Sequence, residues 1–162
     1  RVQAHDWTGY LRARIETHGP AAPLQGLARA GWKLVYTEIP NLAIGDAASD
    51  GEYEDLRFSL GLSIASDQGT ISEVLWDGPA YRAGITRDMQ VVAVNHLAYK
   101  PERLKRAILV AKSDQQPIEL LLRQGDTYRS VSIDYREGLR YPHLQRIAGT
   151  PDRLQQILAP RQ

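Results

Sequence analysis

Cysteine is absent from the 162 residues, so disulfide bonds and thiol chemistry are excluded. The chain carries 20 basic and 19 acidic residues, which gives a formal net charge of only +1. This balance, with no basic tract, gives no electrostatic reason to expect binding to nucleic acid or to an anionic membrane. No apolar run approaches the roughly 18 residues that a membrane-spanning helix needs. The length is nevertheless enough to bury a core, in one domain with appendages or in two small domains.

The sequence also lacks the signatures of an enzyme. The four histidines are isolated, with no His-Glu-x-x-His or other metal-ligand spacing, and no glycine-rich phosphate loop occurs. No serine lies in a Gly-x-Ser-x-Gly nucleophile elbow. One acidic cluster lacks the spacing of an EF-hand loop, so we interpret it as a solvated linker: Asp46, Asp50, Glu52, Glu54 and Asp55. We predict that this chain catalyses no reaction and holds no metal or cofactor.

The most informative stretch that is present runs over residues 57–64. A turn centred on Gly61 leads into apolar residues at every second position, which is typical of a strand. A short turn and helix follow Gly78, and helical spacing recurs over 101–111. Strands are predicted over residues 56–64, 70–76, 90–94, 118–123 and 128–134, with Gly125-Asp126 as the last hairpin turn.

Both flanks are predicted to contain helices. Asp6 can cap a first helix whose apolar residues recur every four positions, and a second short helix fits 23–30. A strand over 32–36 and a loop over 40–51 follow, and a last short helix ends before Pro160. Because two short helices cannot bury their own apolar faces, we expect the N-terminal arm to pack on the central part or on sequence outside this chain. The first residue is Arg rather than Met, so we interpret the chain as a piece of a longer protein.

These features resemble, in this order, a PDZ domain of the bacterial kind. Ser59-Leu60-Gly61-Leu62 matches the carboxylate-binding loop of that family, and residues 78–85 match its turn and short helix. Asn95-His96 replaces the usual Asn-Gly, which alters a turn rather than the groove. The resemblance implies an α+β fold, a small partly open β-barrel or sandwich with two helices. We predict an N-terminal helical arm and linker (1–52), a PDZ-like domain (53–136) and a C-terminal tail with a short helix (137–162).

The resemblance also implies a peptide groove. In PDZ domains, converging backbone N–H groups capture a C-terminal carboxylate, and the peptide adds as a strand to an open sheet edge. Here the loop at Gly61, assisted by Arg57, would hold the carboxylate, and residues 62–65 would offer the edge. Helix 101–111 would form the opposite wall, with Leu104 facing the residue two places before the last in the ligand. The predicted site residues are Arg57, Ser59, Leu60, Gly61, Leu62, Ser63, Ile64, Leu104, Ile108 and Ala111.

The flanks extend the resemblance to nearly the whole chain. Asp6-Trp7, Gly31 to Leu34, Gly138 to Ile147 and Pro151 to Leu154 are similar to the C-terminal region of the glycyl aminopeptidase family. These are bacterial gluzincin-type zinc metallopeptidases that carry a C-terminal PDZ domain. The resemblance implies a parent hydrolase that releases N-terminal Gly or Ala, with its zinc ligands upstream of Arg1. Members are often exported, so a periplasmic or secreted location is expected.

Two functional hypotheses follow. In the first, the chain is the peptide- or protein-binding PDZ module of a metallo-aminopeptidase, with free C-termini and the upstream catalytic domain as its partners. In the second, it is a structural or regulatory domain that packs on the catalytic domain and gates substrate access, without binding free peptides. An open loop at residues 60–62 favours the first hypothesis, whereas a groove filled by the chain itself favours the second.

Overall fold

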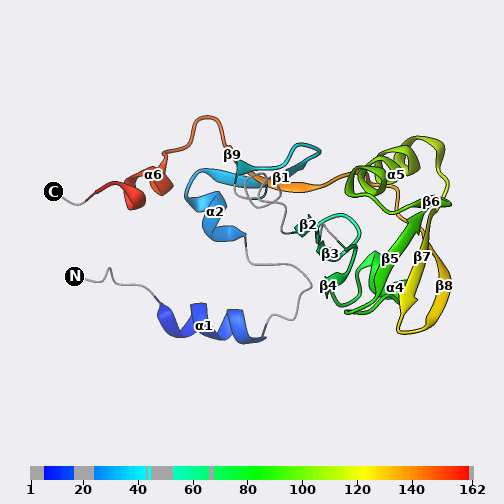
Figure 1. The fold of residues 1–162 in the computed structure, drawn as a ribbon. Helices are drawn as coiled ribbons and strands as arrows, with labels where there is room; N and C mark the ends of the chain where they lie inside the picture. The colour runs from blue at the N-terminus through cyan, green and yellow to red at the C-terminus, as the bar shows by residue number, and fades with distance from the viewer. Residues whose placement is uncertain (1–5, 17–23, 43, 45–52, 66–67, 161–162) are drawn as a thin grey trace. The chain divides into compact units, whose positions relative to one another are not determined.

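The computed structural model describes residues 6–16, 24–42, 44, 53–65 and 68–160 (Figure 1). The chain forms two compact units, one of residues 1–33 with 146–162 and one of residues 34–145. The second unit therefore contains the predicted PDZ-like segment together with parts of both predicted flanks. The two units are described separately.

The helices in the described part of the first unit are α1 (Trp7–Glu16), α2 (Gln25–Arg29) and α6 (Arg153–Leu158). Asp6 caps α1, as predicted, because its Oδ1 accepts a hydrogen bond from the Gly9 N–H at 2.9 Å. Asp152 caps α6 in the same way, by accepting the Gln155 N–H, and its Oδ1 also accepts from the Trp32 indole, both at 3.0 Å. The capping aspartate therefore links α6 to the beginning of β1 (Trp32–Thr37).

β1 pairs with β9 (Tyr141–Arg146) in a two-stranded sheet. The sequence predicted β1, but β9 lies in what was predicted to be an irregular tail. The Ile147 N–H donates to the Gly31 carbonyl at 2.9 Å and so continues the pairing next to the sheet. Since the two strands lie more than 100 residues apart in the sequence, no local pattern announces their pairing.

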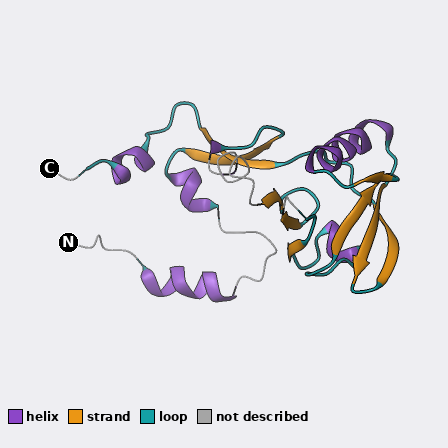
Figure 2. Cartoon of the chain, in the orientation of Figure 1, coloured by secondary structure: helices purple, strands orange, loops and turns teal. Residues whose placement is uncertain are grey.

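Besides most of the β1-β9 sheet, the described part of the second unit contains two antiparallel sheets (Figure 2). The smaller has the order β2-β3-β4 and consists of β2 (Tyr53–Leu56), β3 (Leu62–Ala65) and β4 (Ile71–Val74). The larger has the order β6-β5-β7-β8 and consists of β5 (Gln90–Val94), β6 (Leu97–Ala98), β7 (Ile118–Gln124) and β8 (Thr127–Ile133). The described part of this unit also contains the helices α4 (Pro79–Arg82) and α5 (Pro101–Asp114). The predicted α+β class is thus confirmed, with sheets that stay open rather than closing into a barrel.

The prediction of one strand over 56–64 is wrong, because the chain reverses direction in the middle of it. The Leu56 carbonyl accepts hydrogen bonds from the N–H groups of Ser59 and Gly61, both at 3.0 Å. Gly61 has a φ of +77°, a left-handed conformation that glycine adopts without steric cost. The result is a tight turn at residues 57–61 that folds β2 back onto β3.

One apolar core fills the second unit. It takes side chains from β3, from one face of α5 and from alternate positions of β7, and its largest fully buried members include Leu62, Ile64, Leu104, Ile108 and Leu120. Along β7 the buried residues alternate with more exposed ones, as the period of a strand requires. This core holds β3 and α5 in fixed positions around β2.

Candidate peptide groove

The loop that the PDZ resemblance identified is packed against the turn before α4. The Leu60 carbonyl accepts the Ala80 N–H and the Gly61 carbonyl accepts the Leu75 N–H, both at 2.8 Å. A Cβ atom at Gly61 would lie 3.2 Å from the Gly78 Cα and 3.4 Å from the Pro79 Cδ. The close approach of these two turns therefore favours glycine at position 61, irrespective of any ligand.

β3 is paired along both of its edges. It is the central strand of its sheet, with β2 on one side, where Leu56 lies opposite Leu62, and β4 on the other, where Val74 lies opposite Leu62. The prediction of an open edge at residues 62–65 is thus wrong for this conformation. The position at which a peptide strand would add is occupied by the chain's own β2.

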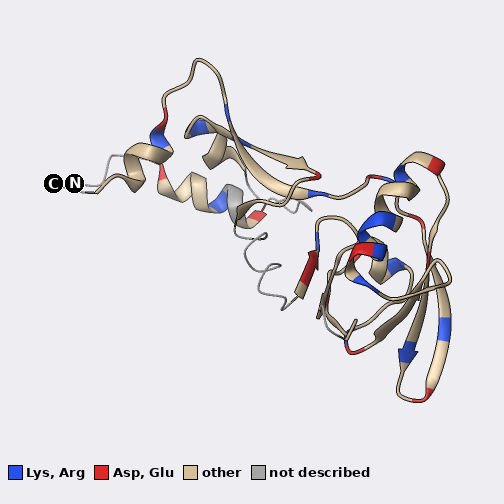
Figure 3. Cartoon of the chain, turned by 45° about the horizontal axis from the view of Figure 1, so that its top comes forward, with Lys and Arg blue, Asp and Glu red and all other residues tan. Residues whose placement is uncertain are grey.

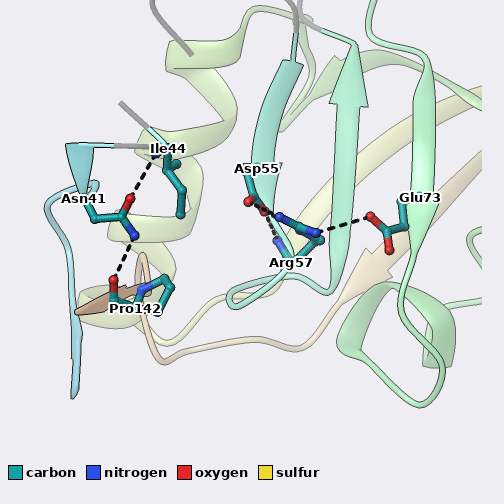
Figure 4. Close-up of polar contacts among 6 residues, drawn as sticks. All are labelled: Asn41, Ile44, Asp55, Arg57, Glu73 and Pro142. Carbon is teal, nitrogen blue, oxygen red and sulfur yellow. Dashed lines mark hydrogen bonds and ion pairs between the residues drawn. The ribbon is translucent and has the colours of Figure 1, made fainter. Parts of the chain in front are cut away.

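β2 lies between β3 and α5. It pairs with β3, and the Glu54 carboxylate on β2 forms an ion pair with the Lys105 ammonium on α5, with 2.6 Å between Oε2 and Nζ. Figure 4 shows β2 between the coil of α5 and the arrow of β3, and in Figure 3 β2 is the red strand near blue segments of α5. Only 11% of the Glu54 side chain and 31% of the Lys105 side chain are exposed. The pair is therefore largely withdrawn from water.

The end of β2 lies at the loop in the orientation of a bound C-terminus. β2 runs antiparallel to β3, so its last residue, Leu56, reaches the turn that precedes β3. The Leu56 carbonyl oxygen accepts hydrogen bonds from two N–H groups of the loop, as a terminal carboxylate would. The Leu56 side chain is only 1% exposed. The loop thus works as an oxygen-binding turn, and the oxygen that it binds belongs to its own chain.

Arg57 is directed at acidic groups of the same sheet (Figure 4). Its backbone N–H, Nε and a terminal nitrogen donate to Asp55 at 3.1, 3.0 and 2.7 Å, and another nitrogen lies 3.8 Å from Glu73. Burial, the largest influence, raises the pKa of Asp55, but the hydrogen bonds and charge of Arg57 outweigh it and lower that pKa below its ordinary value. The guanidinium predicted to assist a ligand carboxylate is therefore engaged by Asp55.

The segment that precedes β9 packs against the loop at residues 57–61. The Ser59 hydroxyl accepts the backbone N–H of Arg140 at 3.0 Å, and the Tyr135 hydroxyl donates to the Gly138 carbonyl at 2.9 Å. Burial first, and then the carboxylates of Glu54 and Asp55, raise the pKa of Tyr141 to about 12. Ser59 is therefore part of a structural contact between the loop and the segment that leads into β9.

The structure brings the predicted site residues together, but as core. Six of the ten belong to one apolar cluster, namely Leu60, Leu62, Ile64, Leu104, Ile108 and Ala111. Among the ten only Arg57 has a substantially exposed side chain, at 40%. The buried members, each exposed by 5% or less, are Ser59, Leu60, Leu62, Ser63, Ile64, Leu104, Ile108 and Ala111. Leu104, predicted to face the ligand residue two places before the last, is a fully buried core residue, and the ion pair from α5 to β2 comes from the next residue, Lys105.

Sequence reasoning missed Glu54, Leu56 and Lys105. Glu54 and Asp55 were assigned to a solvated linker, yet they are only 8% and 5% exposed; the other three members of that acidic cluster lie outside the described residues. The available signal was Lys105, a basic residue beside the apolar stripe of α5 that a buried acid could pair with. Because the pair is distant in sequence, its existence depends on the tertiary fold.

Elsewhere in the described residues, no group of three or more His, Cys, Asp or Glu side chains could hold a metal ion. No helix in the described ranges has the length and apolar character to cross a membrane. The first unit has an open apolar pocket of about 640 Å³ beside Trp32 and α6, lined in part by Leu154, Leu158 and Pro160. None of the predicted site residues lines this pocket.

Comparisons with known proteins support the fold. No protein-family profile and no curated protein sequence matches the chain. A crystal structure of an aminopeptidase N family protein from Idiomarina loihiensis matches 99% of this chain and 27% of its own, with 16% sequence identity and a TM-score of 0.60. The HtrA3 PDZ domain, crystallised with a phage-derived ligand, matches 71% of this chain and 91% of its own, with 18% identity and a TM-score of 0.37, which is too low to show a shared fold. The chain therefore shares its fold with about a quarter of an aminopeptidase N family protein.

Proposed function

We propose that this chain is the non-catalytic, PDZ-like part of an aminopeptidase-related protein and acts there as a structural or regulatory domain with a closed groove. The observation that carries the proposal is the seating of β2 between β3 and α5, with the Leu56 carbonyl on the loop N–H groups. The fold that the chain shares with part of a longer aminopeptidase N family protein supports the proposal that the chain belongs to an aminopeptidase-related protein. The zinc site and the specificity for N-terminal Gly or Ala that the family resemblance implies belong to sequence outside this chain.

Covalent attachment gives β2 a large advantage over a free peptide. A tethered segment acts at an effective concentration on the order of millimolar or above. A free peptide that makes the same contacts also loses translational and rotational freedom, which the tethered strand does not. We therefore expect free C-termini to compete poorly with β2 in the native chain.

Capture of free peptide C-termini is the second candidate function. It is favoured by the fact that the loop does donate two N–H groups to an oxygen at the end of an antiparallel strand. The two functions differ in what the native chain does with an added peptide: a closed domain leaves it in solution, whereas an open one binds it through its carboxylate.

The deciding experiment titrates the 162-residue chain with a library of peptides that have free C-termini, each paired with its amidated form. The closed-groove function predicts no binding that depends on the free carboxylate at peptide concentrations up to about 1 mM. Binding at micromolar concentrations that is lost on amidation would replace this proposal with the second candidate. In a parallel assay with added zinc, we expect no hydrolysis of Gly- or Ala-nitroanilide by the chain alone; hydrolysis would refute the non-catalytic assignment.

A further inference from the structure

β2 has an unusual composition for a strand within a folded core. Its four residues are Tyr-Glu-Asp-Leu, and both acids are less than 10% exposed. Asp and Glu are depleted in strands and are rarely buried without a partner. Here the partners come from outside the strand, Lys105 for Glu54 and Arg57 for Asp55. Leu56 is the only fully buried apolar residue that β2 contributes.

The side chains of β2 alternate between its two faces, as the side chains of a peptide bound in a PDZ groove do. Successive side chains of a strand alternate between faces, so Leu56 and Glu54 share one face and Asp55 lies on the other. Glu54 pairs with Lys105 of α5, and Leu56 enters the apolar core between β3 and α5. Counting back from the loop, the last position is apolar and the third from last is acidic.

We propose that β2 is a displaceable internal ligand, and that the groove between β3 and α5, once vacated, binds a peptide with a free C-terminal carboxylate, an apolar last residue and an acidic third-from-last residue. The proposal rests on the closed-groove function and identifies what opens the groove and what then enters it. The N–H groups of Ser59 and Gly61 receive the carboxylate, the Leu56 space receives the last side chain, and Lys105 selects the acid.

The contacts that hold β2 explain why it can leave. Removing two charges from water costs nearly as much free energy as their mutual attraction provides, so a largely buried ion pair adds little net stability. The other polar contact of β2, between Asp55 and Arg57, joins residues two positions apart and does not attach the strand to α5. The attachment therefore depends on Leu56, the four-residue ladder with β3 and the Glu54–Lys105 pair.

The test uses Glu54→Arg, which places a like charge against Lys105 and keeps Lys105 available for an added peptide. The probe is the fluorescently labelled pentapeptide Glu-Tyr-Glu-Asp-Leu with a free carboxylate, the sequence of residues 52–56. We expect the variant to bind the probe at least ten-fold more tightly than the native chain. Amidation of the probe, or lysine at its third-from-last position, should each weaken binding to the variant at least ten-fold.

Two control variants separate displacement from a general effect of charge. Glu119→Arg makes the same substitution at an exposed strand position on β7 and should bind the probe as weakly as the native chain. Glu54→Arg combined with Lys105→Glu restores the ion pair with its signs exchanged, so β2 should reseat. The lysine form of the probe, which matches the exchanged charge at position 105, should then bind this double variant no more tightly than the original probe binds the native chain. Tight binding by the double variant would contradict displacement through this pair.

A measurement on the native chain keeps the proposal testable if Glu54→Arg does not fold. We expect the Ser59 and Gly61 N–H groups to exchange with solvent deuterium at least 100-fold faster than the N–H groups of Leu120 and Leu122 in β7. Equal protection of the two sets, or a folded Glu54→Arg chain that ignores the probe, would overturn the internal ligand while leaving the closed groove in place. Native binding as tight as that of the variant would instead overturn the closed groove.

Discussion

β2 and β7 are both held within the second unit, but by different kinds of contact. β7 pairs with β5 and β8 and buries Ile118, Leu120 and Leu122, each 1% exposed, on one face. β2 pairs with β3 alone, buries one leucine and relies on two carboxylates for its remaining contacts. Burial of apolar surface stabilises the fold in proportion to the buried area. The attraction within a buried ion pair is largely cancelled by the cost of removing its charges from water, so the pair adds little net stability. We infer that β7 belongs to the stable core of the fold and β2 to a part that opens at a lower free energy.

The largest expected effect comes from truncating a leucine on each strand. Leu120→Ala should lower the free energy of global unfolding by about 2–5 kcal/mol, because it leaves a cavity in the core. Leu56→Ala should lower it by only about 1–2 kcal/mol, because the loss cannot exceed the free energy at which β2 detaches locally. Urea denaturation of both variants measures the two values. Equal losses would show that β2 is as integral to the core as β7.

Removing the charge that faces Glu54 should have the next largest effect. Lys105→Met leaves the largely buried Glu54 carboxylate without a partner, which should lower the free energy of unfolding by about 1–2 kcal/mol. The loss is smaller than for a fully buried pair because the pair is partly exposed and because β2 can open locally. Adding Glu54→Gln should recover most of the loss, since the neutral side chain needs no countercharge. A double variant as unstable as Lys105→Met would indicate that Lys105 acts through packing rather than charge.

Asp55 should make stability depend on pH in the acid range. Its pKa is lower in the folded chain than its ordinary value, so its contribution is complete at neutral pH and is lost as pH falls below about 4 through the folded pKa. Asp55→Asn should cost about 1 kcal/mol at pH 7 and progressively less as pH falls. Denaturation midpoints between pH 2 and 7 test this. A constant difference across that range would mean that the charge of Asp55 makes no contribution.

The smallest expected effect is a stabilisation confined to the larger sheet. Asn95 and His96 have φ values of 45° and 65° in the two-residue turn between β5 and β6. His96→Gly should raise stability by about 0.5 kcal/mol, because glycine relieves the left-handed strain at some cost in chain entropy. Hydrogen exchange of the variant should show slower exchange in β7 and unchanged exchange at Ser59 and Gly61. Equal slowing at all of these sites would argue against separate opening of β2.

Most of the larger sheet and the helices could be predicted from the sequence. The strands predicted over 90–94, 118–123 and 128–134 lie within a residue or two of β5, β7 and β8, and α5 begins at Pro101 as predicted. Local signals sufficed there, because alternation, helical spacing and a Gly-Asp turn all act between near neighbours in the chain. Six of the ten predicted site residues share one buried cluster, but their role in peptide binding stays a prediction.

The strands that escaped prediction are those whose pairing is distant or whose residues look like a linker. β9 pairs with β1 across more than 100 residues, and β6 is only two residues long. β2 contains two acids among its four residues, which in isolation favours solvent. β9 therefore depends on a distant partner, β6 is too short to show an alternating pattern, and β2 depends on Lys105 and Arg57 to accommodate its acids.

The sequence by itself determined the α+β class, the order of the central elements and the turn at Gly61, because periodicity and backbone preference are properties of short segments. Only the tertiary structure decided that β2 pairs with the edge of β3 at which a peptide strand would add. Two carboxylates enter the second unit because Lys105 and Arg57 meet them there, and the Leu56 carbonyl reaches the loop because the turn folds β2 back onto β3. Of these contacts, the Glu54–Lys105 pair joins elements about 50 residues apart, so its free energy exists only in the assembled fold.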